Sequence, residues 1–186
     1  MKARLRLYLI NYMWKGVAKR VAHEQPYVVA VTGTVGKTSC KEAMALVLRQ
    51  SDRAVVKPAG SLNTEVGVPL ALLGYSSTPQ GLLGWFSVLL RSFNPPKLAK
   101  NSHPYYVLEF SADKPGDILF LATKMNLQVG VLTAITPAHL QEYKNFEELV
   151  AEKASIFKGL DQKGYAVLNA DDPQQQKIAL LVVYGL

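Results

Sequence analysis

The chain has 186 residues, 49% of them hydrophobic and 19% charged, which excludes a disordered chain and a fibrous repeat. Its single cysteine, Cys40, excludes an intramolecular disulfide and a thiolate-rich metal site. The net charge of +7 is concentrated at the N terminus, where residues 1–24 hold six lysine or arginine residues and one glutamate; the nearly neutral remainder argues against a nucleic-acid partner.

The N-terminal segment, residues 1–25, is predicted to be a basic amphipathic helix. Its longest uncharged stretch, residues 7–14, is far shorter than the roughly 20 apolar residues of a membrane-spanning helix. Arg6 and the basic pair Lys19-Arg20 disfavour a signal peptide. Two interpretations remain: peripheral contact with an anionic membrane through residues 1–24, or packing on the neighbouring domain. In either case we expect the segment to be separable from the sheet that follows.

From residue 26 onward, short β-branched runs alternate with helical patterns. Strands are expected at 27–31, 53–57, 105–110, 127–133, 165–169 and 178–184. Helices are expected at 37–50, 82–90, 115–125 and 146–159, and another begins at 171–173. This alternation predicts an α/β fold of P-loop type: a mostly parallel sheet with helices on both faces. Because the last expected strand has no helix after it, the domain at 26–186 is expected to be incomplete at its C terminus.

A glycine-bearing loop follows the first expected strand and precedes a helix, which is the context of a phosphate-binding loop. The loop comprises Gly33, Thr34, Val35, Gly36, Lys37, Thr38 and Ser39. Backbone amides and the helix N terminus would face the phosphates, Lys37 would reach the β and γ oxygens, and Thr38 would bind Mg²⁺. Val31 stands where the common pattern has its first glycine, so the loop is a variant.

Further motifs follow in a fixed order. They are Asn63-Thr64 with Gly67-Val68-Pro69, Glu109 with Pro115-Gly116-Asp117-Ile118, Thr133-Ala134 with Pro137-Ala138-His139-Leu140, Lys153, and Asn169-Ala170-Asp171-Asp172. Together with the loop, over residues 26–186, they resemble the central ATP-binding domain of the Mur ligases, which build the peptide stem of peptidoglycan. The segments at 67–69 and 137–139 are most similar to the branch that adds D-alanyl-D-alanine to a UDP-muramoyl tripeptide.

The resemblance implies a cytoplasmic, ATP- and Mg²⁺-dependent carbon–nitrogen ligase of peptidoglycan precursor synthesis. Its substrates would be a UDP-MurNAc-peptide and an amino acid or dipeptide, joined through an acyl phosphate. The residues that would act catalytically are Lys37, His139 and Lys153, with Lys153 carbamylated. Thr38, Glu109 and His139 would bind Mg²⁺, and Asn63 and Thr64 would face the UDP-muramoyl substrate.

Two departures from the family pattern, Ser111 for glycine and Ala134 for asparagine, indicate local divergence. The family's UDP-binding and C-terminal domains have no counterpart in the sequence, so these missing domains are expected partners and the fragment alone is expected to be inactive. Two alternatives stay open. One is a ligase resembling folylpolyglutamate or cyanophycin synthetases. The other is a non-catalytic P-loop module that docks on a membrane or protein through residues 1–24.

Overall fold

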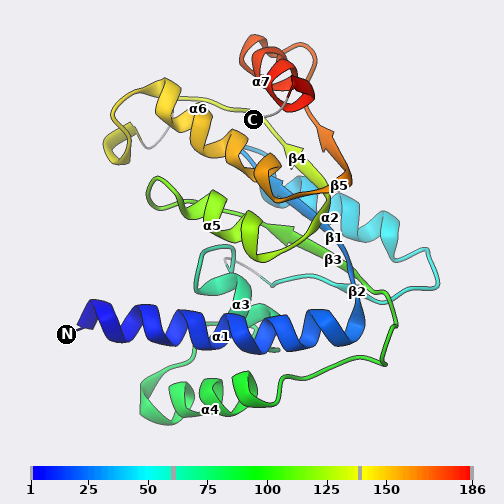
Figure 1. Cartoon of the computed structure of the whole chain (residues 1–186), viewed down its shortest axis with the longest axis vertical. Coiled ribbons are helices and arrows are strands. Elements are labelled where there is room, and N and C mark those ends of the chain that lie inside the picture. Colours follow the sequence, from blue (N-terminus) through cyan, green and yellow to red (C-terminus); the bar gives the residue numbers. More distant parts are fainter. Residues whose placement is uncertain (1, 60–61, 138–139, 185–186) are drawn as a thin grey trace.

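A computed structural model describes residues 2–59, 62–137 and 140–184. Within these residues, five parallel strands form one sheet in the order β2-β3-β1-β4-β5 (Figure 1). The strands are β1 (Tyr27–Thr32), β2 (Val55–Val56), β3 (Tyr105–Glu109), β4 (Leu127–Leu132) and β5 (Leu160–Val167). The predicted α/β class and parallel sheet are therefore confirmed.

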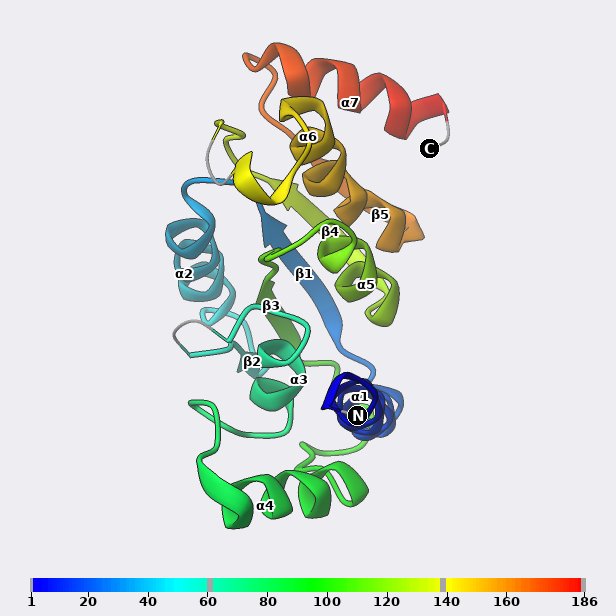
Figure 2. The ribbon, with the colours of Figure 1, turned by 90° about the vertical axis from the view of Figure 1, so that its left-hand side faces the viewer.

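Helices cover both faces of the sheet, as parallel strands require because their crossovers run over the faces. One face is covered by α2 (Lys37–Leu48), and the other by α5 (Asp117–Lys124) and α6 (Phe146–Ala154) (Figure 2). A 3₁₀ turn, η1 (Leu140–Glu142), precedes α6, and a second, η2 (Ser155–Gly159), continues it into β5. Beyond the β2–β3 side lie α1 (Lys2–Glu24), α3 (Gly67–Leu72) and α4 (Gly81–Phe93).

The central strand, β1, is buried on both faces, and this fixes where its loop emerges. Ala30 and Val31 are fully buried, and Val31 is paired with Glu109 of β3 and Val131 of β4. Because all the strands are parallel, the carboxyl ends of β1, β3 and β4 meet at one edge of the sheet. Ligands of open α/β sheets bind at this edge.

The N-terminal helix α1 packs on the domain. Its inner face, formed by Ile10, Met13, Trp14 and Val17, belongs to the same buried cluster as the side chains of β3 and α5. Of the two interpretations, packing is therefore the observed one for this face. Within the described residues, none of the helices combines the length and hydrophobicity needed to span a bilayer.

A buried polar network fixes the end of α1 to the sheet, and this contact argues against the expectation of a separable segment. Glu24, fully buried, accepts hydrogen bonds from Arg20 Nε at 2.8 Å and from the Tyr106 hydroxyl of β3 at 2.7 Å. Arg20 also donates to the Leu72 carbonyl at 2.6 Å. Burial and the hydrogen bond to Glu24 raise the pKa of Tyr106. Removing α1 would leave the Tyr106 hydroxyl, the Leu72 carbonyl and the apolar face of the domain without these partners.

The strand predicted at 178–184 is wrong, because these residues lie in the helix α7 (Pro173–Tyr184). Asp172 caps this helix by accepting the Gln174 amide at 2.9 Å, and proline at the first helical position favours its start. Ile178 is buried while Leu181 is 52% exposed, so only one face of the apolar segment packs. Because this segment is not a strand, the expectation of a last strand without a covering helix is also wrong.

Two strand boundaries also differ from the prediction. The second strand contains only Val55 and Val56, because it pairs on one side with the start of β3. The fifth spans Leu160–Val167, earlier than the predicted 165–169. Its first residue, Leu160, pairs with Leu127, and an irregularity in register separates this pair from the later ones.

Candidate functional site

The loop between β1 and α2 has a shape that two glycines make possible. Gly33 has φ 144° and Gly36 has φ 85°, both in the region that favours glycine. A Cβ atom on Gly33 would lie 2.0 Å from Thr133 Oγ1, so a side chain cannot be accommodated there. The Thr34 amide donates to the Ala134 carbonyl at 2.8 Å, which holds the loop against the segment after β4. Gly36 then caps α2, whose N terminus carries unsatisfied amides and a partial positive charge.

A buried carboxylate at the end of β3 faces the start of α2. Glu109 is only 3% exposed; its Oε2 accepts the Thr38 hydroxyl at 3.0 Å and its Oε1 accepts the Asn63 amide at 3.0 Å. Lys41 Nζ lies 3.3 Å from the same Oε2 and is also buried. Of the predicted metal ligands, Thr38 and Glu109 are thus adjacent, whereas His139 lies outside the described residues.

The chemistry of Thr38 and Glu109 fits Mg²⁺. A hydroxyl and a carboxylate are hard oxygen ligands, and Mg²⁺ commonly takes one or two protein oxygens together with phosphate oxygens and water. Within the residues that the structure describes, no three His, Cys, Asp or Glu side chains form a cluster suited to a metal. The two oxygens therefore suit an ion that is shared with a nucleotide rather than one enclosed by protein.

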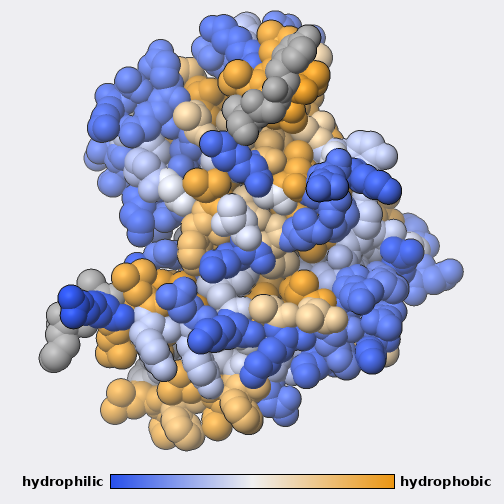
Figure 3. Space-filling model, viewed as in Figure 1, coloured by the Kyte–Doolittle hydropathy of each residue, from blue (hydrophilic) through white to orange (hydrophobic). Residues whose placement is uncertain are grey.

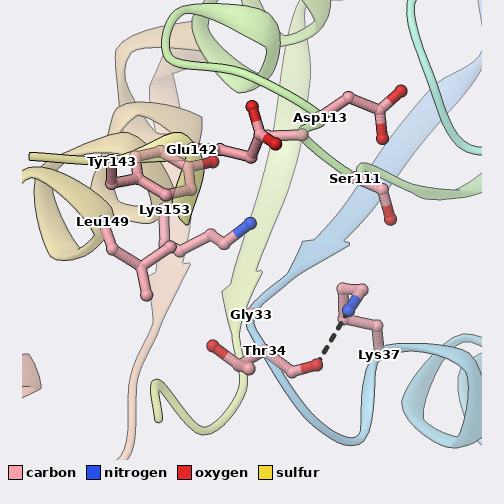
Figure 4. A pocket seen from close by; sticks show the side chains of 10 residues that line it. Gly33, Thr34, Lys37, Ser111, Asp113, Glu142, Tyr143, Leu149 and Lys153 are labelled. Atoms are coloured by element: carbon pink, nitrogen blue, oxygen red, sulfur yellow. Dashed lines mark hydrogen bonds between the residues drawn. The ribbon is translucent and has the colours of Figure 1, made fainter. Parts of the chain in front are cut away.

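A pocket of about 390 Å³ lies beside the loop, where the ends of β1 and β3 meet η1 and α6 (Figure 4). Its lining comprises Gly33, Thr34, Lys37, Ser111, Ala112, Asp113, Glu142, Tyr143, Leu149 and Lys153. Lys153 extends from α6 toward the loop, and Lys37 Nζ folds back to donate to the Thr34 carbonyl at 3.0 Å (Figure 4). Two lysines thus share one cavity.

Burial is the main influence on both lysines. It lowers the pKa of Lys153, which is 5% exposed, and repulsion from Lys37 lowers that pKa further. Burial also lowers the pKa of Lys37, although the charge of Glu109 opposes this change. The two lysines repel each other, and Asp113 and Glu142 in the same lining supply carboxylates that offset part of this charge. The loop side of the pocket, where Lys37 lies at the N terminus of α2, is suited to a nucleotide phosphate.

The two predicted substrate-facing residues make hydrogen bonds within the protein. The Asn63 amide holds Glu109, as described above, and the Thr64 hydroxyl accepts the Gly67 amide at 3.2 Å at the start of α3. Asn63 therefore lies beside the metal and phosphate residues. The Thr64 hydroxyl is engaged by the first residue of α3.

Two residues of this site were not predicted from the sequence. Lys41 lies one helical turn after Thr38, and that spacing is the available signal that both face Glu109. Tyr143 lines the pocket, and its hydroxyl has no hydrogen-bond partner within the part of the chain that the structure describes. Burial, with the nearby charge of Glu152, raises the pKa of Tyr143 to about 12. No motif marks Tyr143 in the sequence.

The parallel sheet, the loop with φ-positive glycines and the pocket beside it define an α/β domain whose loop has the geometry expected of a phosphate-binding loop. A family model for the Mur ligase middle domain matches residues 92–183. The chain is 31% identical over 159 residues to the UDP-N-acetylmuramoyl-tripeptide–D-alanyl-D-alanine ligase of Mycobacterium leprae, covering 86% of this chain and 26% of that one. It is 30% identical to the enzyme of the same name from Escherichia coli K12, covering 78% and 26%.

The fold is also similar to that of solved MurF structures. A MurF crystal structure from Acinetobacter baumannii superposes with a TM-score of 0.73 at 24% identity, covering 96% of this chain and 33% of that one. MurF ligase from Thermotoga maritima in complex with ADP gives a TM-score of 0.69 at 29% identity, covering 90% and 34%. The chain belongs to the Mur ligase family. It spans about a quarter of the length of the curated relatives it matches.

Proposed function

We propose that this chain supplies the nucleotide-binding part of an ATP-dependent carbon–nitrogen ligase that acts in peptidoglycan precursor synthesis. The observation that carries the proposal is that Lys37 of the loop and Lys153 of α6 line one pocket, while Thr38 of the same loop is hydrogen-bonded to Glu109. The reaction would begin when a substrate carboxylate attacks the γ-phosphorus of ATP and displaces ADP. The amine of the second substrate would then attack the acyl phosphate carbon, lose a proton and expel phosphate, which forms the amide.

The first step brings together two anions, so charge neutralisation dominates its barrier. Lys37 would exchange its contact with the Thr34 carbonyl for the β- and γ-phosphate oxygens. The loop amides and the N terminus of α2 would orient the same phosphates. Thr38 and Glu109 would hold Mg²⁺, which neutralises phosphate charge when it is bound.

We further propose that Lys153 is carbamylated, as its position in the family pattern implies. The neutral amine would attack the carbon of CO₂, form the new nitrogen–carbon bond and release a proton. The lowered pKa of Lys153 supports this step, because only the neutral amine is nucleophilic. The product is an anion beside Lys37, which relieves the repulsion between the two lysines.

The names of the relatives support a UDP-MurNAc-peptide and D-alanyl-D-alanine, or an amino acid, as the substrates of the protein. The proposal includes a cytoplasmic activity, where ATP is available, and the other Mur ligase domains as working partners. Peripheral membrane contact through residues 1–24 is restricted to their outward-facing side chains, because the inner face of α1 is buried.

Nucleotide binding tests the proposal directly. We expect Mg²⁺–ADP to bind the chain, and Lys37→Ala to weaken the affinity by about tenfold to a hundredfold, because charge-assisted contacts to phosphate are strong. Titration calorimetry measures the loss, and Lys163→Ala on exposed β5 is the matched control. Equal affinity in the parent and Lys37→Ala would contradict the phosphate-site assignment. Binding without any turnover in the longer protein would favour the non-catalytic alternative.

A further inference from the structure

The outward face of α4 is an unusual surface for a nucleotide-binding domain. Leu82 and Leu83 are 91% and 87% exposed, and the stripe continues with Phe86, Leu90 and Phe93, each more than half exposed. Residues 82, 86, 90 and 93 recur at helical spacing, so they share one face of the helix. The opposite face is buried through Val88 and Ser92 against α1. Figure 3 shows hydrophobic atoms gathered over α4 along the lower edge of the molecule.

The helix that carries this stripe has no acidic residue, and cations outnumber acids around it. Residues 66–108, which include all of α4, contain no aspartate or glutamate, and the only acidic residue of α1 is the buried Glu24. Among the side chains that the structure describes, the two helices and the segment after α4 carry seven exposed cations, Arg4, Arg6, Lys15, Lys19, Arg91, Lys97 and Lys100, of which Arg6 is paired with Glu65. Lys19 also lies over the Phe93 ring, 5.1 Å from its centroid. An apolar stripe that carries no acidic side chain and has Lys19 against one end is complementary to an anionic interface.

Close packing makes α1 and α4 one unit. A Cβ atom on Gly16 of α1 would lie 2.6 Å from the Ser92 carbonyl oxygen, so glycine lets the two helices approach. Lys19 Nζ donates to the Phe93 carbonyl at 3.2 Å. Between the helices lies an apolar groove of about 330 Å³, lined by Leu5, Leu9, Ile10, Met13, Val66 and Trp85, with Arg6 also in its wall. The stripe and the groove therefore keep a fixed relation to each other.

We infer that the α1–α4 surface docks on an anionic phospholipid membrane, with α4 lying in the plane of the interface. The apolar stripe would enter the boundary between head groups and acyl chains, and the lysines and arginines would contact lipid phosphates. A second copy of the chain fits less well, because a two-fold contact would place the same cations against each other. In Figure 2, α4 lies at the end of the molecule opposite the carboxyl ends of the strands, so docking would leave the phosphate pocket open to water.

Vesicle flotation with the full chain tests this inference. We expect binding to vesicles of phosphatidylcholine mixed with phosphatidylglycerol, weak binding to phosphatidylcholine alone, and release as salt rises. The variant Leu82→Gln/Leu83→Gln/Phe86→Gln should reduce binding by about tenfold or more, since it removes most of the exposed stripe. The matched control is Leu46→Gln/Val47→Gln on α2, where both side chains are also exposed, at 62% and 70%. Circular dichroism should show both variants folded, because all five positions face solvent.

A charge variant tests the contact of the lysines with lipid phosphates separately from the insertion of the apolar stripe. Lys97→Gln/Lys100→Gln should weaken binding to anionic vesicles and leave the weak binding to neutral vesicles unchanged. Equal binding to both lipid compositions, or equal losses in the α4 and α2 variants, would overturn the inference. So would a dimer in sedimentation that the α4 variant converts to a monomer, because a second copy would then cover the stripe. Nucleotide affinity is expected to be the same in all these proteins, so failure here is distinguishable from failure of the proposed function.

Discussion

At the scale of single residues, Lys41 is the neighbour on which the Glu109 carboxylate depends. Both side chains are buried, and their charged atoms lie 3.3 Å apart. Removing one member of a buried pair leaves the other charge uncompensated. We expect Lys41→Met to lower the free energy of unfolding by about 3 kcal/mol in the absence of metal and nucleotide. Urea unfolding measures this change.

A double-mutant cycle supplies the control for Lys41. Glu109→Gln added to Lys41→Met removes the orphaned carboxylate, so the double variant should recover part of the lost stability. If Lys41→Met unfolds at the same urea concentration as the parent protein, the pair does not stabilise the fold. A loss that Glu109→Gln does not relieve would assign the effect of Lys41 to packing alone.

Lys153 makes the stability of the fold depend on pH in a direction that can be predicted. Its pKa in the folded protein is below the ordinary value of 10.5, so the unfolded chain binds its proton more tightly. Stability must therefore rise with pH between the folded pKa and 10.5, and the cost of the buried charge is fully present below the folded pKa. We expect Lys153→Met to raise the free energy of unfolding at neutral pH and to flatten the rise toward alkaline pH.

Urea unfolding across the neutral and alkaline range, in CO₂-free buffer, measures this slope. The control is Lys144→Met, whose parent side chain is 88% exposed and should leave the slope unchanged. The free energy of unfolding of Lys153→Met is subtracted from that of the parent at each pH. A difference that stays flat or falls as the pH rises would contradict the lowered pKa of Lys153.

At the scale of elements, α1 is a structural part of the domain. Trp14 is 5% exposed, meets Phe120 of α5 edge to face at 6.1 Å and donates to the Glu65 carbonyl at 3.3 Å. We expect Trp14→Ala to cost about 3 kcal/mol of stability, as other large-to-small core changes do. Thermal unfolding measures the loss, with Tyr8→Ala at a 68% exposed position as control. A chain lacking residues 1–22 that unfolds like the parent would show that α1 is dispensable.

The sequence allows some elements to be predicted well and others poorly, for a physical reason. Strands at 27–31, 105–110 and 127–133 were predicted to within a residue of the observed ends, because buried parallel strands are short β-branched runs between clear breakers. The segment 178–184 is apolar at every position, so it has no periodicity to distinguish a strand from a helix. Only its packing and the Asp172 cap decide that it is helical.

The same contrast holds for the candidate site. An ordered set of motifs placed Lys37, Thr38, Glu109 and Lys153 at one edge of the sheet, and the structure does bring them near one another. Their chemical roles stay predictions. Lys41 and Tyr143 were missed because a lysine on a helix and a tyrosine in a connecting segment are ordinary residues in a sequence. Their burial depends on contacts between elements distant in the chain.

At the scale of the whole molecule, binding and ligation should separate. We expect the 186-residue chain to bind Mg²⁺–ADP but not to join D-alanyl-D-alanine to a UDP-muramoyl tripeptide. Amide formation requires carboxylate, phosphate and amine in near-attack geometry, with water kept from the acyl phosphate. The chain spans about a quarter of its relatives' length, so the rest of that geometry is expected from other domains. A phosphate-release assay with both substrates measures turnover, and robust release of phosphate coupled to ligation would contradict this expectation.

The position of β1 in the sheet has a consequence for how the protein folds during synthesis. Of the five strands of this sheet it is the first to be synthesised, yet both of its neighbours, β3 and β4, lie far later in the chain, beginning at Tyr105 and Leu127. Until they emerge, the apolar segment from Tyr27 to Thr32 has no strand partner, and a long loop must close before either pairing forms. Sheets built from such distant pairings fold slowly, and their unpaired strand edges are prone to aggregation until the pairings form. We therefore expect translation to outpace folding, so that nascent chains held at the ribosome before residue 132 remain protease-sensitive and bind chaperones.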